Sequence, residues 1–185
     1  ELKRHFRDKG WALKVPRDLQ ELALRVDRTT DRLVHDRGRA PLEAKSLGVQ
    51  LGPDDIAVRC NTVAIEDGTM FDFTAGHIKT EESRQLIAEM ESHFGQDGQH
   101  FYPGVSYRHL LVLRKPGGVH AACTPPHNIT GKAVESYLPK GNDAPLLLDL
   151  MEKSKPIFAD HPVNKARLKA NETPATQIWL WGQGP

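Results

Sequence analysis

The stretch RCNTVAIEDGTMFDFTAGHIKTEE, which runs from Arg59 to Glu82, decides the fold. It predicts a strand, a tight turn, a second strand, a loop and the start of a helix. Asp67-Gly68 lies between two apolar runs and indicates a β-hairpin, because a type I′ turn needs positive φ at both central residues. Thr80 is a good N-cap residue, and the two glutamates after it stand where the helix dipole favours anions. A hairpin followed by a helix is therefore the centre of the predicted domain.

Outward from this stretch, strands and helices are mixed and hairpin signals are frequent. Strands predicted at Ile56–Ile65 and Val105–Arg114 are expected to be central, with Met70–Phe73 as the hairpin partner of the first. The apolar stripe of Glu81–Phe94 predicts a helix that packs on them. Further elements are predicted as a helix at Leu42–Leu47, a strand at Val119–Cys123, a helix that begins after Asp143 and is kinked or ended by Pro156, a helix from His161 to about Lys169, and a strand at Gln177–Trp181. The pattern predicts an α+β fold with a largely antiparallel sheet and helices packed on one face.

The composition is that of an ordinary globular domain. Of 185 residues, 38% are hydrophobic and 26% are charged, and the formal net charge is +1. This charge favours neither nucleic acid nor a membrane as a partner, and no apolar run is long enough to span a bilayer. The two cysteines, Cys60 and Cys123, fall in predicted strands and are expected to be buried thiols in a reducing compartment. We therefore expect a cytoplasmic protein.

Residues 1–39 differ in character from the rest of the chain. Basic residues outnumber acidic ones there, and the apolar residues near one helical face are Leu19, Leu22, Ala23, Val26 and Leu33. One interpretation is a helix that packs by this stripe. The other is a basic arm for phosphate or nucleic acid, although acids are interleaved with the bases. We treat 1–39 as a helical N-terminal flank, separate from 40–185.

The sequence contains no P-loop, GxGxxG, CxxC, HExxH or GxSxG motif, so it offers no recognisable catalytic or metal-binding residue. The remaining candidates are Arg and His residues at strand and loop edges, together with one amide. An arginine fork donates two parallel hydrogen bonds and suits a carboxylate or phosphate. The candidate substrate-binding residues are Arg59, Asn61, His77, Arg108, His127 and Arg167.

Each candidate also has a structural interpretation. Arg59 and Arg108 could face solvent from a one-sided antiparallel sheet, and His77 could be a hydrogen-bonded loop residue. His127 follows two prolines in a rigid loop, which favours a binding role, whereas Arg167 is typical of a solvated helix residue. Other polar and aromatic residues are expected to be structural: His109 and His120 on the sheet surface, His161 at a helix start, Asp72 in fixing the hairpin loop, and Trp179 and Trp181 in packing.

Five motifs carry a resemblance to a known family: RCNTVAIEDGTMFDFTAGHIKTEES, FYPGVSYRHLLVL, PPHNITGK, HPVNKAR and TQIWLWGQGP. In this order they resemble the archaeal-type cofactor-independent phosphoglycerate mutases of the alkaline phosphatase superfamily. Some bacterial members of that family are described as homoserine-kinase-like. The resemblance runs from Gly38 to Pro185.

The resemblance implies that 40–185 is an inserted α/β lid domain with a short return to a phosphatase-like domain at its C-terminal end. In that family the phosphatase-like domain holds two divalent metals, manganese or magnesium with zinc as a further alternative. It also carries a serine that is phosphorylated while 3-phosphoglycerate and 2-phosphoglycerate interconvert. The lid would hold the phosphorylated substrate and exclude water.

Arg59 and Arg108 lie mid-strand and His127 follows a strand through a rigid loop, so these three are expected to converge on one concave face. Asn61 and His77 are expected to border that face, with Arg167 reaching it from HPVNKAR. The resemblance implies that the face looks towards the phosphatase-like domain and holds the carboxylate and hydroxyls of phosphoglycerate.

The sequence departs from the family's pattern at two places. The Pro-Gly-Ser-Asp loop expected before Gly38 is absent, and Asn128 stands where the family has Asp. The serine and the metal ligands are therefore not identified in this chain, which is expected to bind no metal and to be inactive alone. Two alternatives remain open: a homoserine-kinase-like phosphotransferase of the same architecture, and a non-catalytic binding module.

Overall fold

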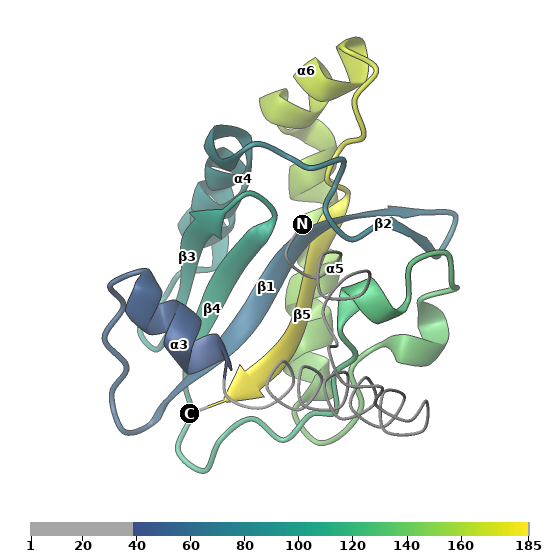
Figure 1. The fold of residues 1–185 in the computed structure, drawn as a ribbon. Helices are drawn as coiled ribbons and strands as arrows, with labels where there is room; N and C mark the ends of the chain where they lie inside the picture. The colour runs from purple at the N-terminus through teal and green to yellow at the C-terminus, as the bar shows by residue number, and fades with distance from the viewer. Residues whose placement is uncertain (1–38, 185) are drawn as a thin grey trace, which may run out of the picture. The chain divides into compact units, whose positions relative to one another are not determined.

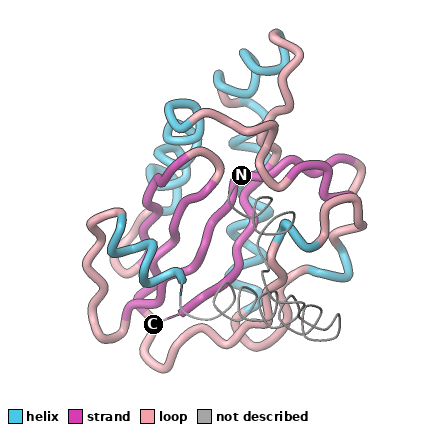
Figure 2. The backbone as a smooth tube through the Cα atoms, viewed as in Figure 1, coloured by secondary structure: helices cyan, strands magenta, loops and turns pink. Residues whose placement is uncertain are grey.

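The computed structural model describes residues 39–184, and the helix and basic arm expected in 1–39 lie outside the described residues. The strands form one antiparallel five-stranded sheet (Figures 1 and 2). They are β1 (Asp55–Glu66), β2 (Thr69–Asp72), β3 (Gln99–Val105), β4 (Arg108–Arg114) and β5 (Gln177–Gly184). The helices are α3 (Arg39–Ser46), α4 (Thr80–Phe94), α5 (Ala144–Asp160) and α6 (Pro162–Lys169), with short 3-10 turns at Pro126–Asn128 and Glu135–Tyr137. The α+β fold with an antiparallel sheet is confirmed. In this part of the chain no helix has the length and apolar character needed to cross a membrane.

The strand β1 is the centre of the sheet, because it pairs with three others. It lies between β4 and β5, so that Arg59 is opposite Leu110 on one side and Trp181 on the other. Its last residues form a hairpin with β2. The turn residues Asp67 and Gly68 have φ angles of 47° and 71°. The predicted hairpin is therefore confirmed, with the left-handed turn that the Asp-Gly pair indicates.

The main core lies between the sheet and the helices α4 and α5, which Figure 1 shows behind the sheet. Because side chains alternate along a strand, Ile56, Val58 and Cys60 of β1 all point into this core. Leu111 and Leu113 of β4 join them, together with the apolar stripes of α4 and α5. The prediction that the helix at Glu81–Phe94 packs on two central strands of one sheet is confirmed.

The helix α3 lies on the opposite face of the sheet (Figure 1). Ala40 and Ala44, one turn apart, pack against Ala57, Leu110 and Val112. The small side chains allow the helix to approach the strands closely. The expectation that helices occupy one face is thus incomplete: β1 is buried on both faces along most of its length, so its second face also needs a cover.

The structure corrects the strand predicted at Val105–Arg114. The chain reverses at Ser106 and Tyr107, so β3 ends where that strand was expected to begin. Ser106 has a φ of 53°; its amide donates to Thr80 Oγ1 at 3.0 Å and its hydroxyl donates to the Ile78 carbonyl at 2.7 Å. These distant contacts stabilise a turn that lacks Gly or Asn. The N-cap residue of α4 is Lys79, one residue before the predicted Thr80.

Two smaller predictions are also wrong, and a third is narrowed to one of its alternatives. Val119–Cys123 is not a strand, because within it only Ala122 forms an isolated bridge, to Lys140. Of the two alternatives for Pro156, ending the helix is excluded, because α5 continues to Asp160, and a kink at Pro156 stays a prediction. His109 does not lie at the sheet surface: it is buried on the core face, opposite Cys60.

Candidate functional site

Arg59 lies in the middle of β1, on the face that α3 covers, and its side chain is 5% exposed. Its guanidinium forms a two-point ion pair with Glu43 of α3, with Nε 3.2 Å from Oε2 and Nη2 2.7 Å from Oε1. Its Cζ lies 4.6 Å from the centroid of the Trp181 ring. A guanidinium held on an aromatic face and largely removed from water is well placed to grip a carboxylate.

Asn61 and the two tryptophans of β5 form the floor of this face. The indole nitrogen of Trp181 donates to Asn61 Oδ1 at 3.0 Å. That of Trp179 donates to the Thr124 carbonyl at 2.8 Å, which attaches the loop before His127 to the sheet. Both indole rings are buried, so their predicted packing role is confirmed. The hydrogen bonds also fix where the surrounding side chains lie.

A chain of ring contacts leads from the floor to the other strand arginine. His127, in the 3-10 turn, has its ring centroid 5.5 Å from Trp181 and 6.1 Å from Phe73. Phe73 lies 5.7 Å from Tyr107 in an edge-to-face arrangement. The Cζ of Arg108 is 5.9 Å from the Tyr107 ring. Both strand arginines and His127 are therefore linked by direct contacts through one aromatic cluster.

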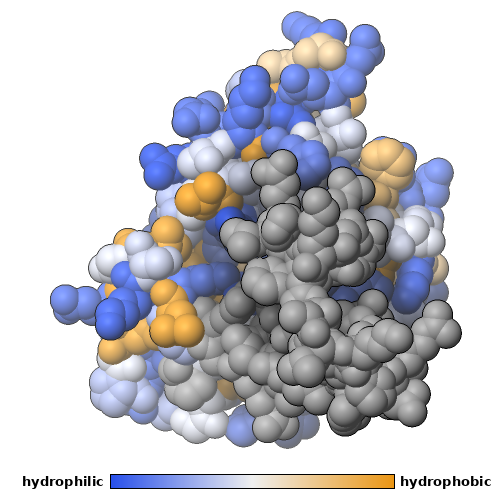
Figure 3. Space-filling view, in the orientation of Figure 1, coloured by the Kyte–Doolittle hydropathy of each residue, from blue (hydrophilic) through white to orange (hydrophobic). Residues whose placement is uncertain are grey.

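Arg108 also lines a cavity of about 150 Å³ between α3 and the β3–β4 hairpin. Glu43 lies on the same wall, so the cavity adjoins the Arg59 ion pair. Val105, which also lines the cavity, is 58% exposed, and Leu42 of α3 is 65% exposed. Figure 3 shows hydrophobic surface over α3 and at the tip of the hairpin. The cavity therefore brings Arg108 and Glu43 next to an exposed apolar residue, Val105.

His77 is presented by a tightly bonded loop after β2. The Asp72 carboxylate accepts hydrogen bonds from the amides of Thr74 and Gly76, at 2.7 and 2.8 Å, and from the Thr74 hydroxyl at 2.7 Å. Burial alone would raise the pKa of Asp72, but these bonds and the nearby His77 outweigh burial and hold the pKa below its ordinary value. The predicted role of Asp72 in fixing the loop is confirmed, and the His77 side chain is exposed.

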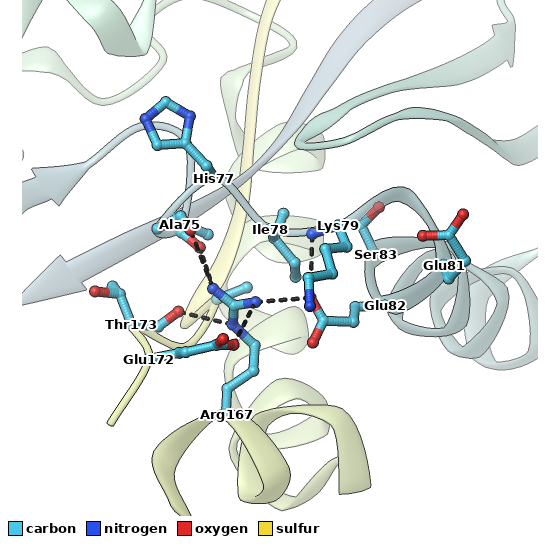
Figure 4. Close-up of polar contacts among 12 residues, drawn as sticks. Ala75, His77, Ile78, Lys79, Glu81, Glu82, Ser83, Arg167, Glu172 and Thr173 are labelled. Carbon is cyan, nitrogen blue, oxygen red and sulfur yellow. Dashed lines mark hydrogen bonds and ion pairs between the residues drawn. The ribbon is translucent and has the colours of Figure 1, made fainter. Parts of the chain in front are cut away.

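Arg167 is placed differently from the other candidates. It is buried at the base of the loop that carries His77, and its guanidinium points to backbone carbonyls and to Glu82 (Figure 4). The interpretation as a solvated helix residue is therefore wrong. Each guanidinium nitrogen has a protein partner, so a direct role in substrate binding stays a prediction that this geometry does not favour.

Sequence reasoning missed two members of the site. Glu43 is the partner of Arg59, but sixteen residues separate them and no local pattern connects them. Phe73 joins the His77 loop to His127 and Tyr107 through its ring. The resemblance motifs contain Phe73, yet only the folded chain shows which rings it touches.

The described residues offer binding groups rather than an activated nucleophile. Burial raises the pKa of the Cys60 thiol, and it raises the pKa of Cys123 to about 11, so both thiols stay protonated near neutral pH. Within residues 39–184, no group of three or more His, Cys, Asp or Glu is arranged to hold a metal ion.

Comparison with known proteins relates this geometry to a family. The sequence model of 2,3-bisphosphoglycerate-independent phosphoglycerate mutase matches residues 31–164. The chain belongs to this family. A mutase of that name from Methanosarcina barkeri is 49% identical over 154 residues, which cover 83% of this chain and 39% of the relative. A protein described as a probable mutase of the same kind from Geobacter sulfurreducens is 46% identical over 151 residues, covering 80% of this chain and 38% of the relative.

The fold of these mutases is shared as well. The cofactor-independent phosphoglycerate mutase from Thermoplasma acidophilum matches with a TM-score of 0.67 at 25% identity, over 83% of this chain and 43% of that one. The family predicted from the five motifs is thus confirmed. The chain spans about two fifths of the length of the curated relatives it matches.

Proposed function

We propose that this chain is the substrate-closing domain of a 2,3-bisphosphoglycerate-independent phosphoglycerate mutase, which interconverts 3-phosphoglycerate and 2-phosphoglycerate. In this assignment 40–185 form the lid, with a short C-terminal return to a phosphatase-like domain, and 1–39 are a divergent flank. The relatives named above carry the mutase name, which favours this substrate over an amino-acid alcohol such as homoserine.

The observation that carries the proposal is the two-point pairing of Arg59 with Glu43. The guanidinium, backed by Trp181, already holds a carboxylate in fork geometry, and phosphoglycerate presents a carboxylate of the same chemistry. In this proposal the carboxylate of the substrate takes the place of Glu43. A charge-assisted hydrogen bond of this kind contributes about 1.5–3 kcal/mol.

The other residues of the face complete the clamp. Arg108 is exposed beside Tyr107, so its long side chain can follow a charged group as the bound glycerate re-orients. His127 can hydrogen-bond a hydroxyl of the substrate from the opposite side of the aromatic cluster. The rings of Trp181 and Phe73 exclude water, which would otherwise hydrolyse a phosphorylated enzyme.

Divalent metals would activate a serine in the phosphatase-like domain, as the family resemblance implies. The described residues of this chain do not fit a metal centre, and no step of the proposal is derived through one. What this chain contributes is binding, orientation and water exclusion.

A chimera tests the proposal. Residues 39–184 replace the matching segment of the Methanosarcina barkeri mutase, and turnover of 3-phosphoglycerate is followed by coupling to enolase. We expect turnover in the chimera and a loss of about one to two powers of ten in its Arg59→Ala variant. The matched control is Arg114→Ala, which removes an exposed arginine that forms ion pairs with Asp55 and Asp97. A folded chimera that turns over homoserine with ATP, or nothing at all, contradicts the proposal.

A further inference from the structure

The loop that carries His77 has an unfavourable backbone. Three consecutive residues, Ala75, Gly76 and His77, have φ angles of 49°, 65° and 51°. Only glycine adopts this left-handed region readily, and residues with a Cβ do so singly rather than in runs. Such a run persists only where surrounding structure determines it. The Asp72 carboxylate supports the loop from one side.

Arg167 also supports this loop, and Figure 4 shows its guanidinium pointing toward Ala75. Its Nη2 donates to the carbonyls of Ala75 and Gly76, at 3.0 and 3.3 Å. Its Nε donates to the Thr173 carbonyl at 2.9 Å, which fixes the side chain against the segment before β5. The side chain is 3% exposed, so these bonds are made out of water.

The same guanidinium also holds the first turn of α4, which begins at Thr80, shortly after His77. Its Nη1 lies 2.7 Å from Glu82 Oε2, and that oxygen also accepts the Lys79 amide at 3.1 Å. The packing leaves no space for a side chain at Gly76, because a Cβ there would lie 2.8 Å from the Thr173 Cβ and 3.1 Å from Arg167 Nη2. One buried cation therefore holds both ends of the segment that presents His77.

We propose that Arg167 is a positioning residue, which holds Ala75–His77 in the left-handed conformation so that the His77 imidazole is presented to the bound phosphoglycerate. The proposal rests on the proposed function, because it takes His77 as a contact of that anion. Arg167 then affects substrate binding by holding the loop, and it does not touch the substrate itself. The fork is essential, since a lysine ammonium cannot reach the loop carbonyls, Thr173 and Glu82 together.

The test is a double-mutant cycle in the 185-residue chain, with the affinity for 3-phosphoglycerate measured by NMR titration. His77→Ala should weaken binding about tenfold, the loss of one charge-assisted hydrogen bond. Arg167→Lys should weaken it by a similar factor when His77 is present, and by less than about twofold in the His77→Ala background. Equal effects in both backgrounds would show that Arg167 does not act through His77.

A second readout is hydrogen exchange of the Ala75, Gly76 and His77 amides without ligand. Arg167→Lys should accelerate the exchange of these amides about tenfold or more. The control is Glu172→Gln, which removes one ion-pair partner of Arg167, at 3.2 Å, and it should leave the exchange rates unchanged. If Arg167→Lys does not fold, Gly76→Ala disturbs the same contact with the arginine in place and should give the same pattern. Unchanged exchange in the tested variant overturns the proposal. If the parent chain binds no 3-phosphoglycerate while exchange responds, the proposed function is wrong and only the loop-holding part of the inference survives.

Discussion

At the scale of single residues, the Arg59–Glu43 pair predicts in which direction a substitution of Glu43 changes the affinity for 3-phosphoglycerate. If the substrate carboxylate displaces Glu43, then weakening Glu43 as a competitor should favour the substrate. We expect Glu43→Gln to tighten 3-phosphoglycerate binding by about two- to tenfold, since a neutral amide holds the fork less strongly than a carboxylate. NMR titration measures this, with Glu66→Gln at the exposed end of β1 as control. Weaker binding in Glu43→Gln would show instead that Glu43 orients Arg59 for the ligand.

A second prediction at this scale concerns how His109 makes the stability of the folded chain depend on pH. Its Nδ1 accepts the Gly104 amide at 3.1 Å, and within the described residues its Nε2 has no hydrogen-bond partner. Burial lowers the pKa of His109 from 6.5 to about 3, so the folded chain keeps the imidazole neutral while the unfolded chain protonates it below pH 6.5. The stability that His109 contributes is therefore complete above pH 6.5 and is lost as the pH falls from 6.5 towards 3.

Urea unfolding at two pH values checks this. Between pH 7 and pH 5 the His109 contribution should fall by about 2 kcal/mol. His109→Gln keeps an acceptor for Gly104 but does not titrate, so the parent chain should lose about that much more stability than this variant over the same interval. His120→Gln, at an exposed position, should behave like the parent. Equal pH dependence in the parent and His109→Gln would contradict the assignment.

At the scale of elements, one amide of α6 joins the helix α5 to the segment before β5. Asn164 of α6 is 2% exposed; its Nδ2 donates to the carbonyls of Phe158 and Ala175 at 2.7 and 2.6 Å, and its Oδ1 accepts the Ala175 amide at 3.0 Å. Removing the amide leaves three buried backbone groups without these partners.

We expect Asn164→Ala to lower the free energy of unfolding by about 2–4 kcal/mol, measured by urea denaturation at pH 7. The matched control is Asn128→Ala, because the Asn128 side chain is exposed and only its backbone carbonyl accepts a hydrogen bond, from Lys132. A loss below about 0.5 kcal/mol in Asn164→Ala would mean that water replaces all three bonds without cost.

At the scale of the whole molecule, the chain spans 39% of the Methanosarcina barkeri relative. We predict that the 185 residues alone have no mutase activity with manganese or magnesium, because the sequence contains no identifiable serine loop to be activated. The measurement is the enolase-coupled assay on the purified chain, with the intact relative as the positive control. Metal-dependent turnover well above the blank would refute this expectation.

The sequence by itself determined the elements whose signals are local. The Asp-Gly turn of the central hairpin, the apolar stripe of α4, the His161 cap of α6 and the apolar run of β5 each depend on residues a few positions apart. They appear in the structure where the pattern predicts them, because neighbouring residues determine turn geometry and helical or strand periodicity. The five family motifs are equally local, which is why the family could be predicted.

Only the tertiary structure decided the environment of the charged side chains. Arg167 was typical of a solvated helix residue, yet its partners Ala75 and Glu82 lie 92 and 85 residues away and bury it. The turn at Ser106 is stabilised by Thr80 and Ile78, 26 and 28 residues distant, and Ser106 adopts a left-handed φ that usually requires Gly or Asn. A charge or a left-handed residue is stable only with partners that satisfy it. Those partners come from segments that are distant in the sequence, so the local sequence cannot indicate them.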